Sequence, residues 1–166
     1  ADVAQHVRVL RLREGEGIVL FDGHGGETPA TLTSVGKRDV VAAAGRHLAI
    51  ERETARQITL YAALIANDRM DWMMQKATEL GAAAIHPLYT HRSQRIPGDV
   101  AKRVEHWRAV AIAACEQCGR NRIPSVHAPE SLDEALAGTQ GATNLLLDAE
   151  GEHGGALPGD AGNVFI

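Results

Sequence analysis

Residues 58–81 decide the fold, and they read ITLYAALIANDRMDWMMQKATELG. The apolar run 58–64 has the length and composition of a buried strand. A helical pattern follows it, with Asn67 or Asp68 placed to cap the helix and Gly81 placed just past its end. A buried strand followed at once by a helix is typical of an α/β domain with a parallel sheet.

The same alternation of strands and helices continues toward the C-terminus. We predict strands at 84–88, 125–128, 143–147 and 163–166, a polar loop at 90–98, a long helix from Asp99 as cap to about Gln117, and a helix from Ser131. Strands separated by helices imply a parallel sheet that is covered on both faces. Ligands of such sheets bind beyond the carboxyl ends of the strands.

The N-terminal part has the pattern of a small β domain. The expected strands are 7–13, in which apolar and basic residues alternate, 17–21, 29–35 and 39–44. Short strands at this spacing are typical of a compact barrel. Gly25 and Gly26 indicate a hairpin turn, because no Lys-Ser/Thr pair follows as in a phosphate-binding loop. We therefore divide the chain into a β-barrel at 1–50, a charged linker at 51–56 and an α/β domain at 57–166.

Composition indicates an ordinary globular protein, with 45% hydrophobic and 23% charged residues. No apolar run approaches the ~20 residues of a membrane span, and no signal segment opens the chain, so we expect a cytoplasmic protein without a membrane partner. The net charge of −4 hides a basic stretch, since residues 92–122 hold seven basic and three acidic residues. Such a stretch can contact phosphate, although a solvated helix face would look the same.

Two thiols, Cys115 and Cys118, have the Cys-x-x-Cys spacing. A zinc site needs four ligands, and the nearest histidines, His106 and His127, make no compact second pair. A redox motif normally begins a helix, whereas this one ends a helix. We therefore expect reduced thiols and no metal, with a redox protein as the alternative that a reversible disulfide would reveal.

Two polar clusters lie on elements of the α/β domain. Lys76 and Glu79 are three residues apart and share one helix face, where a plain surface ion pair is the alternative. In the loop at 91–95, Arg92 and Arg95 flank Ser93 and Gln94. Two guanidinium groups at this spacing can grip a phosphate through several donors, and a solvated loop is the alternative.

A third cluster follows the long helix, where Glu116, Gln117 and Arg120 are three and four residues apart. On a helix, this spacing would let the carboxylate and the amide hold the guanidinium in one orientation. An oriented guanidinium is useful where negative charge develops in a reaction. Capping of the helix end by Arg120 is the alternative.

These motifs together resemble the bacterial 16S rRNA uridine-N3 methyltransferases of the SPOUT class, which act on uracil 1498 of that RNA. The matching stretches are VLR at 9–11, QKATELG at 75–81, HRS at 91–93, AACEQCGR at 113–120 and LLLDAE at 145–150. The resemblance implies a PUA-like RNA-binding barrel, an α/β domain with a trefoil knot, S-adenosylmethionine as cofactor, the 16S rRNA of the 30S subunit as partner, and a homodimer.

The resemblance also implies roles for particular residues. The catalytic candidates are Arg92, Glu116, Gln117 and Arg120. The cofactor candidates are Leu147, Asp148 and Ile166. The arginines expected to contact RNA are Arg8, Arg11, Arg92, Arg95, Arg120 and Arg122.

The sequence departs from the family pattern at its ends. The family continues with a Gly-Pro-Glu-Gly-Gly loop and a Leu-Gly…Arg-Thr-Glu-Thr segment, which form the knot and most of the cofactor pocket, whereas this sequence stops at Ile166. A histidine pair near the start of the family is represented only by His6. We expect both ends to be incomplete and this stretch alone to be inactive, and a non-catalytic RNA-binding or dimerisation module is the alternative.

Overall fold

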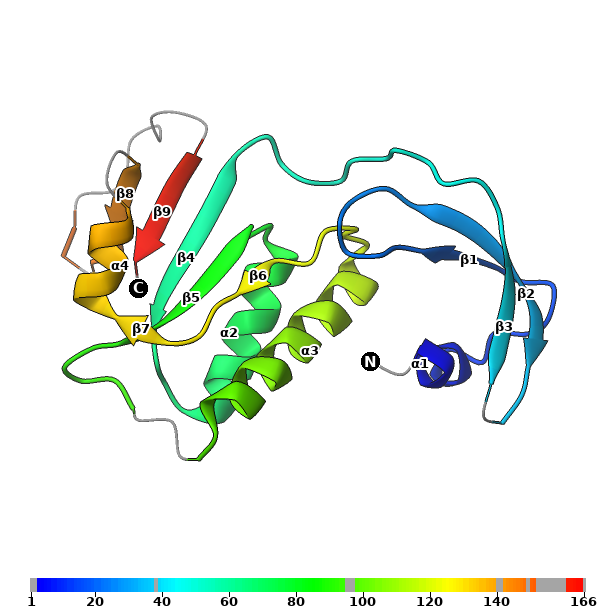
Figure 1. Cartoon of the computed structure of the whole chain (residues 1–166), viewed down its shortest axis with the longest axis horizontal. Helices are drawn as coiled ribbons and strands as arrows, with labels where there is room; N and C mark the ends of the chain where they lie inside the picture. Colours follow the sequence, from blue (N-terminus) through cyan, green and yellow to red (C-terminus); the bar gives the residue numbers. More distant parts are fainter. Residues whose placement is uncertain are drawn as a thin grey trace. The chain divides into compact units, whose positions relative to one another are not determined.

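The computed structural model describes residues 3–37, 39–94, 98–139, 142–148, 150–151 and, for the backbone, 161–165. The chain divides into two compact units. The first unit holds Ala1–Arg52 together with Gly119–Arg122, and the second holds Glu53–Cys118 and Ile123–Ile166. Figure 1 follows the elements of both units along the chain.

The first unit is built on a three-stranded antiparallel sheet in the order β1-β2-β3. Its elements are α1 (Val3–Val9), β1 (Gly17–Leu20), β2 (Thr28–Val35) and β3 (Val40–Ala44). Ala30 and Leu32 alternate with exposed residues along β2 and are buried, as expected for a strand with one face on a core. Single bridges add Leu48 to Glu27, and Arg122 to His24.

The strand predicted at 7–13 is wrong, because this stretch holds the last residues of helix α1 and the turn that ends it. Val7 is buried, whereas Val9, two residues on, is 72% exposed, so the residues do not alternate as in a strand. Arg11 has φ +55°, its N–H bonds to the carbonyl of Arg8 at 3.0 Å, and the N–H of Leu12 bonds to the carbonyl of Val7 at 3.1 Å. These bonds form a Schellman motif, which ends the helix.

The second unit has a six-stranded sheet in which every strand pair is parallel, as predicted. The strands are β4 (Gln57–Ala63), β5 (Ala84–Tyr89), β6 (Ser125–Val126), β7 (Glu130–Ser131), β8 (Thr143–Leu146) and β9 (Ala161–Phe165). The order is β6-β5-β4-β9-β8, and β7 also pairs with β5. The short strand β7 was not predicted.

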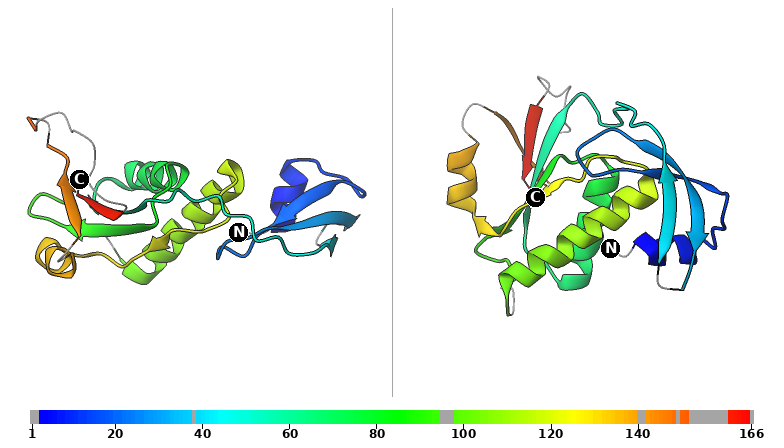
Figure 2. Two further views of the ribbon diagram at one scale, coloured as in Figure 1. Left: turned by 90° about the horizontal axis from the view of Figure 1, so that it is seen from above. Right: turned by 45° about the vertical axis from the view of Figure 1, so that its right-hand side comes forward.

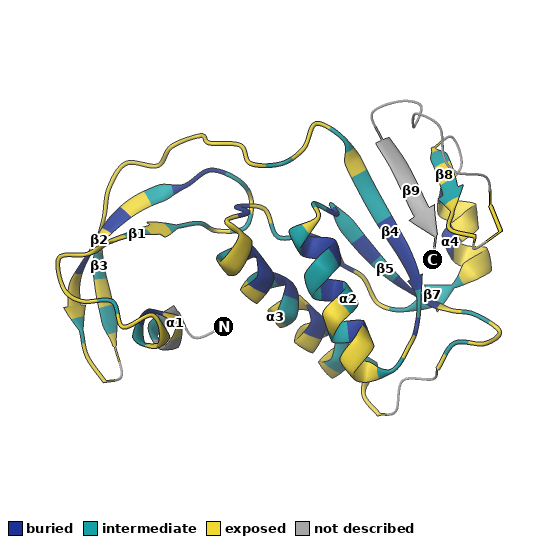
Figure 3. Cartoon of the chain, turned by 180° about the vertical axis from the view of Figure 1, so that it is seen from behind, coloured by how far each residue is buried: buried dark blue, intermediate teal, exposed yellow. Residues whose placement is uncertain are grey.

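Helices cover both faces of this sheet. Leu60 and Ala62 of β4 belong to the core beneath α2 (Asn67–Glu79) and α3 (Val100–Cys118), in which Trp107 is buried. Tyr61 points to the opposite face, where it joins a smaller core with Ala135 of α4 (Leu132–Gly138). Figure 3 shows buried and exposed residues alternating along α2 and α3, as expected for helices with one face on the core.

The helix ends correct one predicted cap, confirm another and show a capping box at the helix predicted from Ser131. The N-cap of α2 is Ala66, which makes no side-chain capping bond, so neither Asn67 nor Asp68 caps this helix. Asp99 caps α3 by accepting a 2.9 Å hydrogen bond from the N–H of Ala101. Ser131 caps α4 in a full capping box, because its hydroxyl and the side chain of Glu134 bond reciprocally to each other's backbone N–H groups.

Candidate functional site

The carboxyl edge of the parallel sheet holds the loop with Arg92. The N–H of Gln94 donates a 3.0 Å hydrogen bond to the carbonyl of Leu64, just beyond β4. Ser93 fixes the turn, because its hydroxyl accepts from the N–H of Thr90 at 2.9 Å and donates to the carbonyl of Thr90 at 3.1 Å. The ordered turn presents the exposed side chain of Arg92 at this edge.

Leu147 and Asp148 follow β8 and lie at the same edge, because β8 and β9 run parallel to β4. Leu147 is 61% exposed, and Leu146 before it is more exposed still. Asp148 accepts a 3.1 Å hydrogen bond from the N–H of Glu150, which fixes the turn after the strand. The edge therefore offers exposed apolar side chains next to a carboxylate.

The opposite, amino edge of the sheet holds the other predicted clusters of the second unit. Glu116 is half-buried and Gln117 exposed in the last turn of α3, which leads to the start of β6. In the last turn of α2, Glu79 bonds to Lys76 at 2.6 Å and to the Gln75 amide at 2.8 Å. The ammonium and the amide hold the pKa of Glu79 below its ordinary value.

One chain does not bring Arg92 and Glu116 together. Helix α3 begins after the loop at the carboxyl edge and ends before β6 at the amino edge, a path that Figures 1 and 2 both follow. Val100 and Glu116 are sixteen residues apart, which corresponds to about 24 Å along the helix axis. Arg92 and Glu116 therefore lie at opposite ends of the second unit.

The helical spacing assumed for Arg120 is also wrong. Helix α3 ends at Cys118, and Gly119 has φ +80°, the left-handed conformation that commonly follows a helix. Arg120 therefore lies beyond the helix and belongs to the first unit, in contrast to Glu116 and Gln117. It is only 8% exposed.

The remaining arginines expected to contact RNA have different surroundings. Arg8 donates to the carbonyl of Lys37, whereas Arg11 is exposed at the end of α1. Arg122 is half exposed and its Nε donates to Glu51 at 3.0 Å. Arg95 and the cofactor candidate Ile166 lie outside the described residues.

The two cysteines are free thiols on one helix. Cys115 is fully buried in the second unit, and Cys118 is exposed. Within the described ranges, no three His, Cys, Asp or Glu side chains gather closely enough to hold a metal ion. The helices of the described ranges are also too short or too polar to cross a bilayer.

A cluster that the sequence reasoning missed lies on the face of the sheet that carries α4. His86 bonds through Nδ1 to Glu130 at 2.6 Å, and its ring stacks on His127 with centroids 3.8 Å apart. Burial, and then the neighbouring His86, lower the pKa of His127, while burial and Glu130 raise the pKa of Tyr61. The sequence carries one signal for this cluster. Tyr61 and His86 each lie in the middle of a predicted strand, so both side chains can face the same side of the sheet.

Comparisons with known proteins bear on both units. An RNA methyltransferase domain family matches residues 52–163, and an RNA methyltransferase PUA domain family matches residues 1–43. The chain belongs to the RNA methyltransferase domain family whose model matches residues 52–163. The family match on residues 1–43 identifies the first unit as PUA-like, in agreement with the predicted fold class.

Individual members of this methyltransferase family agree in sequence and structure. The Bacillus subtilis ribosomal RNA small subunit methyltransferase E is 32% identical over 137 residues, which is 81% of this chain and 54% of the relative. The Synechocystis protein of that name is 31% identical over 84% of this chain and 45% of its own length. The chain thus spans about half the length of these curated relatives.

The structural comparison agrees with this assignment. The Neisseria gonorrhoeae ribosomal RNA small subunit methyltransferase E, crystallised with S-adenosylmethionine, has a TM-score of 0.84 and 34% identity. The match covers 99% of this chain and 71% of that structure.

Proposed function

We propose that the protein containing this chain transfers a methyl group from S-adenosylmethionine to N3 of a uridine in 16S rRNA, in the cytoplasm. The observation that carries the proposal is the parallel sheet of a methyltransferase family with Arg92 and Asp148 at its carboxyl edge, where ligands of such sheets bind. The PUA-like unit at residues 1–50 is proposed to bind RNA, and residues 57–166 to hold the catalytic machinery.

The cofactor candidates at this edge fit S-adenosylmethionine. Leu147 and Leu146 expose apolar surface that can cover an adenine ring, and Asp148 adds a carboxylate that can accept hydrogen bonds from ribose hydroxyls. When bound, the cofactor supplies an electrophilic methyl group. We expect Leu147→Ser and Asp148→Asn to weaken S-adenosylmethionine binding in calorimetric titration, whereas Asp133→Asn on α4 should leave it unchanged.

The chain's own residues would act on the uracil. N3 is a weakly acidic imide between two carbonyl groups, so methylation requires loss of its proton and stabilisation of the charge on the flanking oxygens. Arg92 is exposed and suited to hold a phosphate or these oxygens. Glu116 is the candidate to accept the proton from N3, and Gln117 is the candidate to orient the uracil. Because Arg120 is buried, we assign it a positioning role.

A homodimer would reconcile these roles with the geometry. Arg92 and Glu116 lie at opposite edges of one chain, so both can serve one reaction centre only if they come from two copies. Two copies related by a two-fold axis would form two such composite centres.

Mixing two inactive variants tests the composite centre. Arg92→Ala and Glu116→Ala should each lose methylation of 30S subunits, measured as N3-methyluridine by mass spectrometry. After co-refolding at equal amounts, half of the dimers carry one intact centre, so about a quarter of the parental activity should return. The exposed arginine of the turn before β1 provides the control, Arg13→Ala, which should keep the parental rate.

The outcomes separate the parts of the proposal. Loss of activity without recovery on mixing would remove the composite site, because Arg92 and Glu116 would then not meet in one reaction centre. Parental activity of Glu116→Ala would remove this residue from catalysis. A parent protein of full length that forms no N3-methyluridine would overturn the proposed function.

A further inference from the structure

The first unit contains a pocket of about 240 Å³ beside the turn that precedes β2. Its lining includes His24, Gly25, Gly26, His47, Glu51 and Arg122. This volume lies below the ~300 Å³ at which pockets for drug-sized ligands begin. The pocket therefore has room for one planar heterocycle rather than for a larger ligand.

Two glycines allow the planar side chains to approach the backbone. Gly25 has φ +97°, and a Cβ there would lie 2.7 Å from Nη2 and 2.8 Å from Cζ of Arg122. Gly26 has φ +76°, and a Cβ there would overlap the imidazole of His47. The guanidinium and the imidazole thus lie directly against the turn, and a side chain at either glycine would displace them.

Backbone bonds hold Arg122 at the pocket. Single bridges pair this residue with Gly23 and His24. The N–H of Gly25 donates a 3.1 Å hydrogen bond to the carbonyl of Asn121, the residue before Arg122. The pocket wall is therefore built before any ligand arrives, which lowers the entropic cost of binding.

The lining groups match a nucleobase better than a free anion. Nε of Arg122 donates to Glu51 at 3.0 Å, and the two side chains are 48% and 51% exposed. A phosphate would meet the negative charge of Glu51, whereas a base edge with amino and carbonyl or ring nitrogen groups can pair with a carboxylate and a guanidinium. Guanidinium and imidazole planes also stack on bases.

We propose that this pocket binds one unpaired nucleobase of the RNA substrate, other than the base that is methylated. The inference rests on the proposed function for the identity of the RNA. It assigns to Arg122 and His47 the recognition of a base rather than a general attraction to phosphate.

The test measures binding of the full-length protein to a synthetic RNA that covers the methylated uridine, with each base in turn removed to leave an abasic sugar. Arg122→Ala and His47→Ala should each weaken binding about tenfold, the loss typical of one stacked base. One abasic position should weaken RNA binding to the parent protein by a similar factor. The same abasic position should cause no further loss of affinity in Arg122→Ala or His47→Ala. Arg13→Ala removes an exposed charge from the same unit and should bind as the parent does.

Three outcomes would overturn the base pocket. Equal losses for Arg13→Ala and Arg122→Ala would indicate diffuse electrostatic attraction. If removal of each base weakened RNA binding equally in the variants and in the parent, no base would occupy the pocket. A lower salt dependence of binding in Arg122→Ala without any abasic effect would indicate a phosphate contact. Methyl transfer is measured separately, so a parent that binds this RNA without methylating it would contradict the proposed function alone.

Discussion

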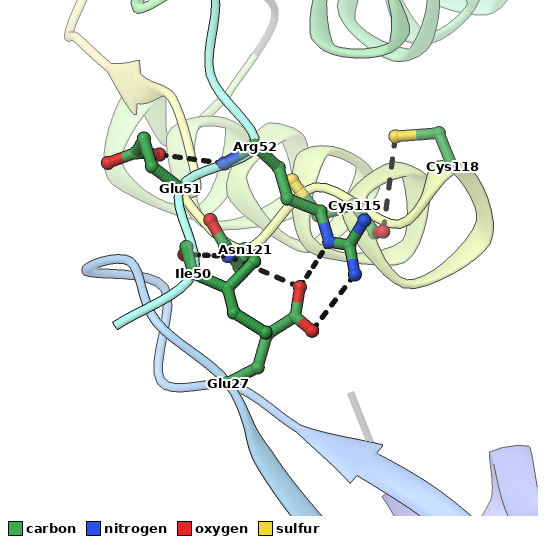
Figure 4. A network of polar contacts seen from close by, with 7 residues as sticks. All are labelled: Glu27, Ile50, Glu51, Arg52, Cys115, Cys118 and Asn121. Atoms are coloured by element: carbon green, nitrogen blue, oxygen red, sulfur yellow. Dashed lines mark hydrogen bonds and ion pairs between the residues drawn. The ribbon is translucent and has the colours of Figure 1, made fainter. Parts of the chain in front are cut away.

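Glu27 shows how one residue organises its surroundings in the first unit. It is 6% exposed and forms a two-pronged ion pair with Arg52, while its Oε1 also accepts a 3.3 Å hydrogen bond from Asn121 (Figure 4). The Asn121 amide donates a second bond, of 2.8 Å, to the carbonyl of Ile50. The bond to Arg52 holds the pKa of Glu27 below its ordinary value of 4.5.

Arg52→Met should therefore destabilise the protein at pH 7, because it leaves a buried carboxylate without its cation. A carboxyl group with a lowered pKa stabilises the fold above its unfolded pKa, and this contribution is lost as the pH falls through the folded value. The difference in thermal midpoint between parent and variant should thus be largest above pH 4.5 and narrow below it. Thermal unfolding followed by circular dichroism across this pH range measures the difference.

Arg122→Met is the matched control for that experiment. Its ion pair with Glu51 joins two half-exposed side chains, and such pairs contribute about 0.5 kcal/mol or less. A control that lost as much stability as Arg52→Met would show that burial of Glu27 is not the cause.

At the scale of the elements, the end of α1 carries an unusual residue. Arg11 adopts φ +55° at the position where a Schellman motif normally has glycine. Arg11→Gly should raise the free energy of unfolding by about 0.5 kcal/mol, because relief of left-handed strain exceeds the entropy that glycine loses on folding. Urea unfolding measures this change, and Arg13→Gly, at a residue without positive φ, should not stabilise.

The capping box of α4 gives a second prediction for an element. Ser131→Ala removes the acceptor for the N–H of Glu134, a 3.2 Å hydrogen bond, and should cost about 1 kcal/mol. Hydrogen exchange of the α4 amides should accelerate with it. Ser125→Ala, at an exposed strand position, serves as the control, and equal losses in both variants would contradict a capping role.

The alternation of strands and helices was predictable because strand β4 and helices α2 and α3 each carry their own apolar period. The structure of the segment at 7–13 was not predictable in this way. Its alternation of apolar and basic residues is typical of a strand, yet the same residues also form the end of a helix. The sequence motifs name candidate residue types for the site, but they do not predict where the fold places these residues. Asn121 bonds to Glu27, 94 residues away, and no local pattern reports such a pairing. The topology likewise separates Arg92 from Glu116 although their motifs suggested a single centre.

At the scale of the whole molecule, the segment Gly119–Arg122 is an integral part of the first unit although its neighbours in sequence belong to the second. Replacing these four residues with a Gly-Ser linker removes the Asn121 side chain, which bonds to Glu27 and to the carbonyl of Ile50. The backbone carbonyl at position 121, which accepts from the N–H of Gly25, is then no longer held in place. Hydrogen exchange at Gly25 should become faster. The amide of Gly15, which bonds to Leu32 within the same unit, should keep its rate, and unchanged exchange at Gly25 would contradict the role of the segment.

The return of the chain to the first unit limits how the genes of such proteins can recombine. Because the chain visits the first unit twice, no single breakpoint yields two intact pieces. A gene fragment ending near Arg52 would encode a β unit without Asn121, and its Glu27 would lose one of its partners. Recombination between relatives can therefore exchange the N-terminal unit and keep its internal contacts only if the segment Gly119–Arg122 is exchanged with it.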